Sequence, residues 1–267
     1  MGETMRAAAT VAMGCCVAMG LMVAPAQAQA NDAEEIIEQA VERNALGFEA
    51  GRAQVVLKVY DEEGEREERH LDVRSRRDGD DGEERSRTVM SLTDPAEVRG
   101  QAFLFVENPE ADDDMWMHVP ALEVTRRVEG DQRRSSFLGT HFTFADLESR
   151  DLREASYTDR GEDRIGEYDV YVIEARPDDP GESDYERVVT YIRQDDKIPI
   201  RTRFYDRNGD LDKTLFTERL AEEGDQKYIE RMTLRSEAGG YTTVEIEELD
   251  SDVEIPESAF SRDELGR

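Results

Sequence analysis

The sequence has few of the side chains that carry metal, redox or nucleophilic chemistry. Its two cysteines, Cys15 and Cys16, lie in the first thirty residues, so the rest of the chain has no disulfide, no thiolate and no cysteine-ligated metal. The three histidines, His70, His118 and His141, are too far apart for a local zinc motif. There is no Gly-X-Ser-X-Gly elbow and no glycine-rich phosphate loop. We therefore predict no catalytic residue, no metal and no cofactor.

Positive charge is also scarce. The 267 residues include 64 Asp and Glu against 34 Lys and Arg, which gives a formal net charge of −30. Nucleic acids and anionic lipid surfaces are bound through Lys and Arg, so this balance argues against both as partners. An acidic surface of this kind suits a protein that works in salt, where charges are screened over about 8 Å or less.

The first thirty residues have the pattern of a secretory leader. An uncharged run over 7–24 follows Arg6, and Ala-X-Ala occurs at 26–28 and again at 28–30. This pattern predicts a signal peptide over residues 1–30 and a mature chain that begins at about Gln29 or Asn31. Two alternatives stay open. The apolar run is just long enough to be an uncleaved membrane anchor, and the residues before Cys15 resemble a lipoprotein cleavage site.

The period of the hydrophobic pattern changes once along the rest of the chain. Over 31–44, Ile36, Ile37, Ala40 and Val41 recur at helical spacing and predict one amphipathic helix. Beyond it, apolar and polar residues alternate as in half-buried strands. Such runs lie at 55–59, 71–73, 90–92, 171–173, 200–204, 232–234 and 244–246. Turn sequences separate them, and Asn208-Gly209 gives the strongest hairpin signal.

These runs predict an α+β fold that is mostly β. We expect an antiparallel meander of about ten or eleven strands, with the N-terminal helix and shorter helices on the concave side of the sheet. Two short helices are expected to begin at Asp94-Pro95 and at Thr143, where each local sequence has a helix-capping pattern. No long linker or repeat divides the chain, so residues 31–267 are predicted to form a single domain.

Aromatic residues gather between positions 99 and 147. Phe103 and Phe105 share one face of a predicted strand whose other face is apolar too. The only tryptophan, Trp116, stands between two methionines, and three phenylalanines follow at 137, 142 and 144. This concentration has two explanations. It is either the centre of the hydrophobic core or an apolar binding site in an otherwise very polar chain.

Four arginines, Arg126, Arg127, Arg133 and Arg134, flank the aromatic region. The simpler explanation is that they pair with the acidic residues at 112–114. The alternative is a docking patch for an acidic partner or a lipid head group. Both explanations stay open at the level of the sequence.

The same region resembles a known family. The resemblance rests on Arg99-Gly100, Phe103-Leu104, Asn108-Pro109, the run from Trp116 to Leu122, Arg126-Arg127-Val128, and the segment Ser136 to Leu147 with its Phe-Leu-Gly-Thr, Phe-Thr-Phe and Asp-Leu. A strand at 168–173 and a hairpin at 198–209 extend it. Over most of the mature chain, the sequence is similar to bacterial outer membrane lipoprotein-sorting proteins, which resemble the periplasmic carriers LolA and LolB.

This resemblance implies a fold and a function. The fold is a LolA-like half barrel, an antiparallel sheet that does not close, with helices on its concave side and a cleft that holds acyl chains. Proteins of this kind are periplasmic carriers and not enzymes, so we expect a monomer that binds the acyl chains of a lipoprotein or lipid. An inner-membrane transporter is the expected protein partner.

We therefore predict a periplasmic carrier that moves acylated cargo towards the outer membrane. Strand parity and composition give nine candidates for the apolar cleft: Leu57, Met90, Phe103, Phe105, Trp116, Phe142, Phe144, Phe204 and Met232. One alternative is a periplasmic interaction module of an inner-membrane exporter that carries nothing and docks through the four arginines. Another is a secreted hydrolase with two carboxylates roughly 5–9.5 Å apart.

Overall fold

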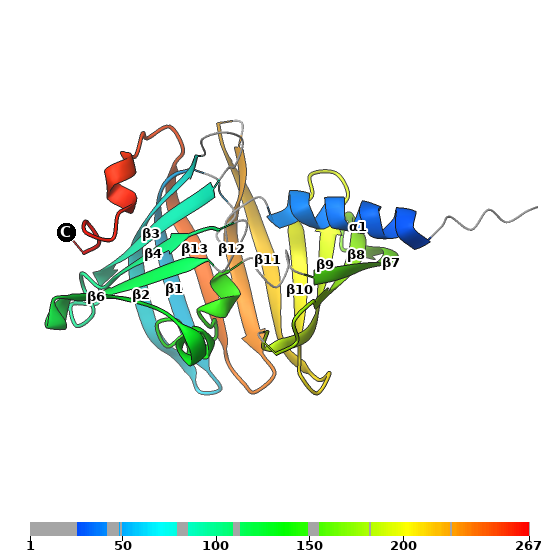
Figure 1. Cartoon of the computed structure of the whole chain (residues 1–267), viewed down its shortest axis with the longest axis horizontal. Coiled ribbons are helices and arrows are strands. Elements are labelled where there is room, and N and C mark those ends of the chain that lie inside the picture. Colours follow the sequence, from blue (N-terminus) through cyan, green and yellow to red (C-terminus); the bar gives the residue numbers. More distant parts are fainter. Residues whose placement is uncertain are drawn as a thin grey trace, which may run out of the picture.

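A computed structural model describes residues 26–41, 48, 50–78, 85–108, 113–148, 155–181, 183–224 and 226–266 of the chain. Most of the expected leader, with both cysteines, lies outside the described residues, as does Asp112. Figure 1 shows a strongly curved sheet with one helix across an end of its concave side and several short helical turns. Among the described helices, none has the length and hydrophobicity needed to cross a membrane.

In the described residues, thirteen antiparallel strands form one sheet. In chain order they are β1 (Gly51–Asp61), β2 (Gly64–Asp78), β3 (Arg85–Asp94), β4 (Ala102–Val106), β5 (Asp114–Val119), β6 (Val124–Arg127), β7 (Ala155–Ile165), β8 (Tyr168–Pro177), β9 (Tyr185–Arg193), β10 (Pro199–Asp206), β11 (Leu211–Glu223), β12 (Gln226–Ser236) and β13 (Tyr241–Asp250). The helix is α1 (Ala26–Val41), and the 3₁₀ turns are η1 (Pro120–Leu122), η2 (Gly130–Arg134), η3 (Ala145–Leu147) and η4 (Glu257–Phe260).

The order of the strands determines where the long connection must lie. It runs β6-β5-β4-β3-β2-β1-β13-β12-β11-β10-β9-β8-β7, so every neighbouring pair except β1–β13 is consecutive in sequence. Strands β6 and β7 follow each other in the chain but lie at opposite edges. The chain between them must therefore pass from one edge of the sheet to the other. We call its described part, residues 128–148, the crossing segment.

The structure confirms the mostly β, unclosed antiparallel fold and corrects the number of strands from about ten or eleven to thirteen. The prediction rested on hydrophobic alternation, and this signal is weak in two edge strands. Strand β6 has four residues, and β7 (ASYTDRGEDRI) is mostly polar or charged. Edge strands need only one paired side and little buried surface, so their pairing is carried by backbone hydrogen bonds.

The predicted helices are corrected in the same way. Helix α1 spans Ala26–Val41, so it begins earlier than the predicted residue 31, and the predicted end at 42–44 lies outside the described residues. At Asp94-Pro95 strand β3 ends and a turn follows, so no helix begins there. The capping pattern at Thr143 does precede a helical turn, η3. The Thr143 amide donates to Asp146 Oδ2, and the Asp146 amide donates back to Thr143 Oγ1.

The main hydrophobic core lies on the concave side of the sheet. Alternation and register place Leu57 opposite Val244, Val244 opposite Met232, and Phe103 opposite Met117, all on this face. The buried members of the core that come from strands are Ala53, Val55, Leu57, Leu71, Val73, Met90, Leu92, Phe103, Met115, Met117, Met232, Leu234, Val244, Ile246 and Leu249.

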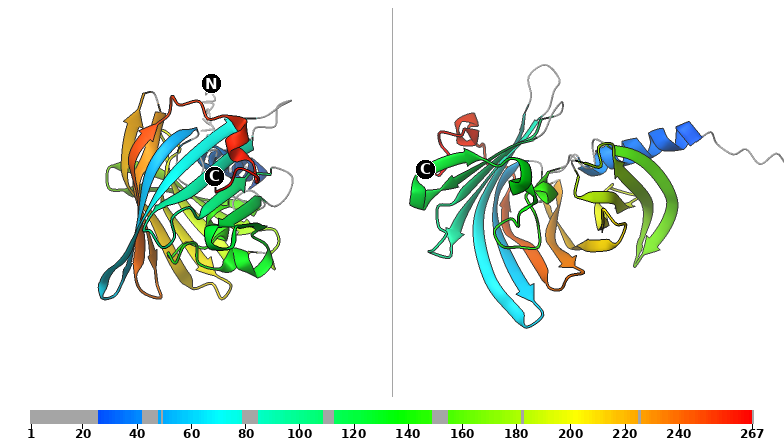
Figure 2. Two further views of the ribbon diagram at one scale, coloured as in Figure 1. Left: turned by 90° about the vertical axis from the view of Figure 1, so that its left-hand side faces the viewer. Right: turned by 60° about the horizontal axis from the view of Figure 1, so that its bottom comes forward.

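Helix α1 covers the other end of the same concave side. Its Ala33, Ile37 and Ala40 pack against Ile173 of β8 and Ile192 of β9. On β9, Ile192 alternates onto the same face as Val188, and Val188 pairs with Phe204 on the concave side. Figure 2 shows α1 beside β7, where the sheet curls most tightly. The helix therefore covers one end of the concave side and leaves the rest to the crossing segment.

The C-terminal residues cover part of the convex side. Phe260 and Leu265 pack against Val89 of β3 and Leu104 of β4, with Trp116 of β5 partly buried beside them. Strand β4 is therefore apolar on both faces because both faces are covered. The Arg262 guanidinium carbon lies 5.3 Å from the centroid of the Trp116 ring and shields the indole further.

Candidate functional site: the concave face and the crossing segment

The crossing segment inserts three aromatic side chains into the concave core. Phe137, Phe142 and Phe144 are all buried there. The ring centroids of Phe103 and Phe137 are 5.0 Å apart, and those of Phe137 and Phe144 are 5.4 Å apart, both in edge-to-face geometry. A tight turn makes this insertion possible, because Leu138 and Gly139 both have positive φ and the Phe137 amide donates to the Phe142 carbonyl at 2.7 Å.

A buried ion pair holds the end of the crossing segment to the sheet. Asp146 Oδ2 accepts a hydrogen bond from Lys213 Nζ at 2.6 Å, and Asp146 Oδ1 accepts one from the Tyr185 hydroxyl at 2.6 Å. The side chains of Lys213 and Asp146 are 5% and 3% exposed. Burial, together with the charge and hydrogen bond of Asp146, raises the pKa of Tyr185 far above its usual value, so this hydroxyl stays a donor.

Two further contacts hold the crossing segment in place. The His141 amide donates to Thr242 Oγ1 of β13 at 3.0 Å, and His141 Nδ1 lies 2.8 Å from the same oxygen. Burial lowers the pKa of His141, and the nearby Lys213 charge lowers it further. Near the other end, Arg133 Nη2 donates to the Asp113 carbonyl, just before β5, at 2.6 Å, and Arg133 Nη1 donates to both carboxylate oxygens of Glu148 within the segment, at 2.9 and 2.8 Å. These contacts fix the segment at both ends and in its middle.

Eight of the nine predicted cleft residues come together on the concave side. Six are buried in the core, namely Leu57, Met90, Phe103, Phe142, Phe144 and Met232, and Phe105 and Phe204 pack against it. Trp116 does not join them. It pairs with Leu104, and both side chains point to the convex side beneath the C-terminal residues. The prediction placed Trp116 by composition, whereas strand parity assigns the concave face to its neighbours Met115 and Met117.

Four important residues of this region were not in the predicted set. Met115 and Met117 could have been found, because they alternate with Trp116 and pair with Phe105 and Phe103. The pairing of Asp146 with Lys213 could not, since 67 residues separate the two and no local pattern connects them.

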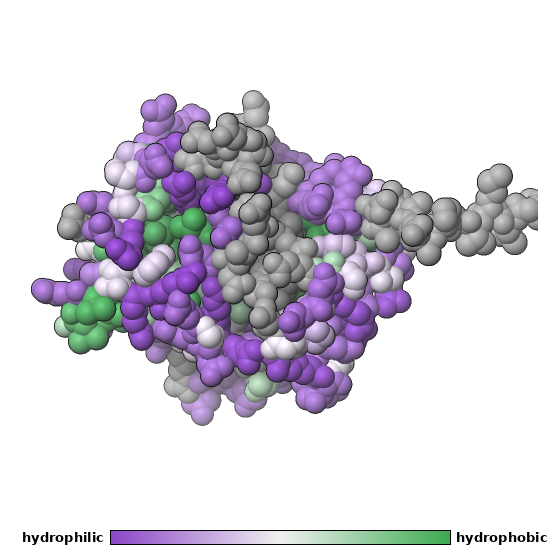
Figure 3. All heavy atoms as spheres, in the orientation of Figure 1, coloured by the Kyte–Doolittle hydropathy of each residue, from purple (hydrophilic) through white to green (hydrophobic). Residues whose placement is uncertain are grey.

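The concave core is partly exposed where the two covers end. Phe204 and Leu215 are half-buried and pack against the core, as do Tyr228 and Ile229. In the space-filling view, hydrophobic residues show among hydrophilic ones on this side of the molecule (Figure 3). The same view shows a hydrophobic group at the turn between β5 and β6, where Leu122 is 70% exposed. The described concave residues thus form an apolar surface that the crossing segment covers only in part.

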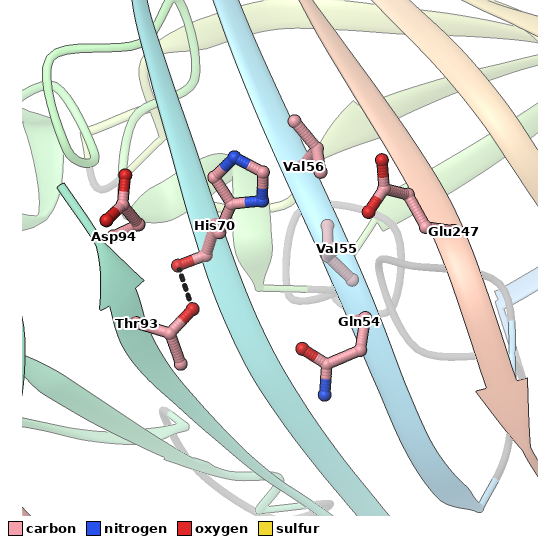
Figure 4. Close-up of a pocket in the computed structure, with 7 residues that line it drawn as sticks. All are labelled: Gln54, Val55, Val56, His70, Thr93, Asp94 and Glu247. Atoms are coloured by element: carbon pink, nitrogen blue, oxygen red, sulfur yellow. Dashed lines mark hydrogen bonds between the residues drawn. The ribbon is translucent and has the colours of Figure 1, made fainter.

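A polar pocket lies away from this apolar surface. It has a volume of about 320 Å³ and is formed by residues of β1, β2, β3 and β13. Its lining residues are Gln54, Val55, Val56, His70, Thr93, Asp94 and Glu247 (Figure 4). Most of these are polar, so the hollow offers no apolar shelter for an acyl chain. Among the described residues, no group of His, Cys, Asp and Glu has the geometry of a metal site.

The four arginines of the proposed docking patch have separate environments. Arg127 forms ion pairs with Asp114 and Glu129, and Arg134 forms one with Asp184 at 3.0 Å. Arg133 is bound to Glu148, as described above. Arg126 is exposed, and no carboxylate of the described residues pairs with it. The simpler explanation, pairing with acids 112–114, therefore holds for the Arg127 side chain.

Comparison with known proteins adds the following findings. A family model with the description "-like: Uncharacterized protein" matches residues 84–267. A protein of the DUF1329 family from Desulfovibrio piger has 23% identity, covers 89% of this chain and 99% of its own, and superposes with a TM-score of 0.79. An outer membrane lipoprotein-sorting protein domain from Vibrio parahaemolyticus has 23% identity, 89% and 100% coverage, and a TM-score of 0.79.

A LolA superfamily protein from Nitrosomonas europaea is similar over 87% of this chain and 99% of its own, with 20% identity and a TM-score of 0.66. No curated protein matches the chain in sequence. The predicted resemblance to outer membrane lipoprotein-sorting proteins is confirmed at the level of the fold.

Proposed function

The chain belongs to the family whose model matches residues 84–267, and it shares the fold of outer membrane lipoprotein-sorting proteins; on this premise we propose that it is a periplasmic carrier of acylated cargo. The cargo is a lipoprotein or a lipid, and it binds on the apolar concave face. The proposal needs no catalytic group, metal or cofactor, and the carrier is not an enzyme.

One observation supports this proposal above the others. Apolar side chains from seven strands converge on the concave side, and the cover over them is neither strand nor long helix but the crossing segment. Each buried methylene contributes about 0.8 kcal/mol, so a chain of about 16 carbons needs a shelter worth roughly 12 kcal/mol to leave a membrane. A sheet lined with Phe, Met and Leu can supply such a shelter once its cover moves.

In this structure the aromatic side chains of the crossing segment occupy the space that an acyl chain would need. Phe137, Phe142 and Phe144 fill the concave core between the sheet and the segment. Carriage therefore requires the segment to swing away from the sheet while the sheet keeps its shape. The polar contacts that must break are those of Asp146 with Lys213, of His141 with Thr242 and of Arg133 with the Asp113 carbonyl, and the segment contributes no strand to the sheet.

The direct test is the lipid content of the protein purified from its native host. Organic extraction followed by mass spectrometry should recover acylated molecules, and the emptied protein should take up a fluorescent fatty acyl probe at about one molecule per chain. A protein without extractable lipid and without probe uptake would refute the carrier function.

A disulfide can test whether the crossing segment must move. The variant His141→Cys/Thr242→Cys is made in a background in which both Cys15 and Cys16 are replaced by serine. Its disulfide joins the segment to β13, because His141 Nδ1 and Thr242 Oγ1 lie 2.8 Å apart there. The oxidised variant should lose probe uptake and regain it on reduction. The matched control is Ser136→Cys/Thr143→Cys, at an antiparallel bridge pair inside the segment. This control should load in both redox states.

The filled concave core also favours a second function, a periplasmic interaction module that carries nothing and serves an inner-membrane exporter. Acyl probe uptake by a variant whose crossing segment is freed distinguishes a carrier from such a module. The module would show no probe uptake even after His141 and Asp146 are both replaced to free the segment, whereas a carrier would load faster.

A further inference from the structure

The convex side of β9 to β12 carries a group of arginines that are not paired with acids. Arg187, Arg201, Arg203 and Arg235 lie there, and none forms an ion pair with a carboxylate of the described residues. We call these four the arginine face. In a chain with 64 acidic residues and a net charge of −30, four neighbouring cations without a carboxylate partner need a physical explanation.

Strand register places these arginines away from the concave side. On β10, Phe204 points to the concave core, so Arg203 and Tyr205 point to the opposite face. On β11, Lys213 reaches Asp146 on the concave side, so its neighbour Thr214 faces the convex side. The described contacts of the C-terminal residues lie over β2 to β5. The arginine face is therefore separate from the proposed cargo site.

The four arginines form three rows across the sheet. In the first row Arg201 lies between Tyr191 of β9 and Phe216 of β11 in the register. Its guanidinium carbon is 5.4 Å from the Tyr191 ring centroid and 5.6 Å from that of Phe216. In the second row Thr214 of β11 separates Arg203 from Arg235.

The arginines of the other two rows also contact tyrosine side chains. Arg203 donates to the Tyr191 hydroxyl at 3.3 Å, and Arg235 lies 5.7 Å from the Tyr241 ring centroid. In the third row Arg187 pairs with Tyr205 in the register and stacks 3.6 Å from its ring centroid. Stacking fixes the plane of each guanidinium and leaves its N–H groups available to an anion.

The contrast with neighbouring cations on the same sheet is sharp. Arg219 forms ion pairs with Glu230 and Glu245, and Arg231 pairs with Glu218 at 3.1 Å. On the arginine face the Nε atoms of Arg187 and Arg201 are buried without a hydrogen bond, as Arg231 Nε is, but unlike Arg231 these two residues also have no ion pair with a carboxylate of the described residues. An incoming carboxylate would give the charge of these guanidinium groups the partner that the described residues do not supply.

We propose that the arginine face docks an extended acidic segment of a partner protein. Arg201 and Arg203 are two residues apart on one strand, which places them about 7 Å apart, the spacing of alternate side chains in an extended peptide. Alternate carboxylates of such a segment can each reach one guanidinium in bidentate geometry. The surface thus recognises a polypeptide with acids at every second residue.

A protein segment fits this surface better than a membrane does. Arg187, Arg201 and Arg203 are half-buried residues whose guanidinium groups lie against rings, so a partner must reach them with its own side chains. A flat bilayer would contact only the most protruding part of the convex surface and would not reach these half-buried side chains. The net charge of −30 also repels an extended anionic surface much more strongly than it repels a short segment.

The test is a titration of a fluorescently labelled peptide of about ten glutamates with the full chain, read by anisotropy at about 20 and about 150 mM NaCl. The wild type should bind the peptide, and the double variant Arg203→Gln/Arg235→Gln should bind it about tenfold more weakly or worse. The matched control, Arg126→Gln/Arg164→Gln, removes two exposed arginines from the edge strands β6 and β7 and should change binding less than twofold.

Three results would overturn the proposal. The first is that the wild type does not bind the acidic peptide, and the second is that the control variant loses as much peptide affinity as Arg203→Gln/Arg235→Gln. The third is that phosphatidylglycerol vesicles bind more strongly than the peptide and their binding depends on the arginine face in the same way. A decalysine peptide gives a control of opposite sign, since its binding to this acidic chain should not weaken in Arg203→Gln/Arg235→Gln. Circular dichroism checks that each variant keeps its fold. Acyl probe uptake should be unchanged in all of them, so this test is independent of the carrier proposal.

Discussion

Asp146 shows how much of this molecule depends on single buried charges. Its carboxylate accepts hydrogen bonds from Lys213, Tyr185 and the Thr143 amide, so all its strong contacts are made inside the protein. Exposed ion pairs such as Arg164–Asp169, with side chains 66% and 65% exposed, are far more common here but contribute little each. The position of the crossing segment therefore rests on one buried pair more than on the many surface pairs.

Replacing Lys213 should cost much more than replacing a surface cation. Lys213→Met leaves the Asp146 carboxylate buried without its charge partner and should lower the free energy of unfolding by about 3–5 kcal/mol. Arg164→Met, which breaks an exposed pair, should lower it by less than about 1 kcal/mol. Urea unfolding measures both. Equal effects of the two substitutions would contradict the importance given to the buried pair.

The His141 side chain should make the stability depend on pH. Burial and the charge of Lys213 lower its pKa in the folded protein, while the unfolded chain takes up the proton near pH 6.5. Below this pH the unfolded state binds more protons, so stability falls as the pH falls; above it the residue is neutral in both states. His141→Gln should remove this part of the loss between pH 7.5 and 5.5.

Urea midpoints at the two pH values provide the measurement. His70→Gln is the control, because His70 lies on β2 beside Glu68 and touches neither Lys213 nor the crossing segment. A wild-type loss that His141→Gln leaves unchanged would show that other groups cause it.

At the scale of secondary-structure elements, alternation in the sequence was enough to assign most strands and their faces. Leu57, Met90, Phe103 and Met232 all lie on the predicted face, because a strand with a period of two permits only one side for each residue. Edge strands β6 and β7 could not be found this way, since one of their sides is unpaired and little of their surface is buried. The path of the crossing segment depends on strand order, and no local pattern encodes strand order.

The two faces of β5 give a testable prediction about Trp116. Because Trp116 faces away from the proposed cargo site, a fatty acid brominated along its chain should quench the fluorescence of this only tryptophan weakly. In Trp116→Phe/Phe142→Trp the indole moves to the concave side, and the same ligand should quench it strongly. If wild-type Trp116 were quenched as strongly as the relocated indole, the ligand would occupy the convex side.

At the scale of the whole molecule, charge is distributed unevenly. The chain as a whole carries a net charge of −30, yet Arg187, Arg201 and Arg203 lie together on the convex side of β9 and β10 and form no ion pair with a carboxylate of the described residues. The concave side, by contrast, is closed by apolar and aromatic residues. The two faces of one sheet are therefore suited to different partners, hydrocarbon on one face and anionic side chains on the other.

The excess of negative charge should make the folded protein more stable in salt. In about 1 M NaCl the screening length falls to roughly 3 Å, so the repulsion among exposed acidic side chains is largely removed. Buried pairs such as Lys213–Asp146 are screened much less. Raising NaCl from about 0.02 to 1 M should therefore raise the urea midpoint. Sucrose at equal osmolality serves as the control and should raise it less, because it does not screen charge. A midpoint that falls in salt would mean that attraction within the surface ion pairs outweighs the repulsion of the whole molecule.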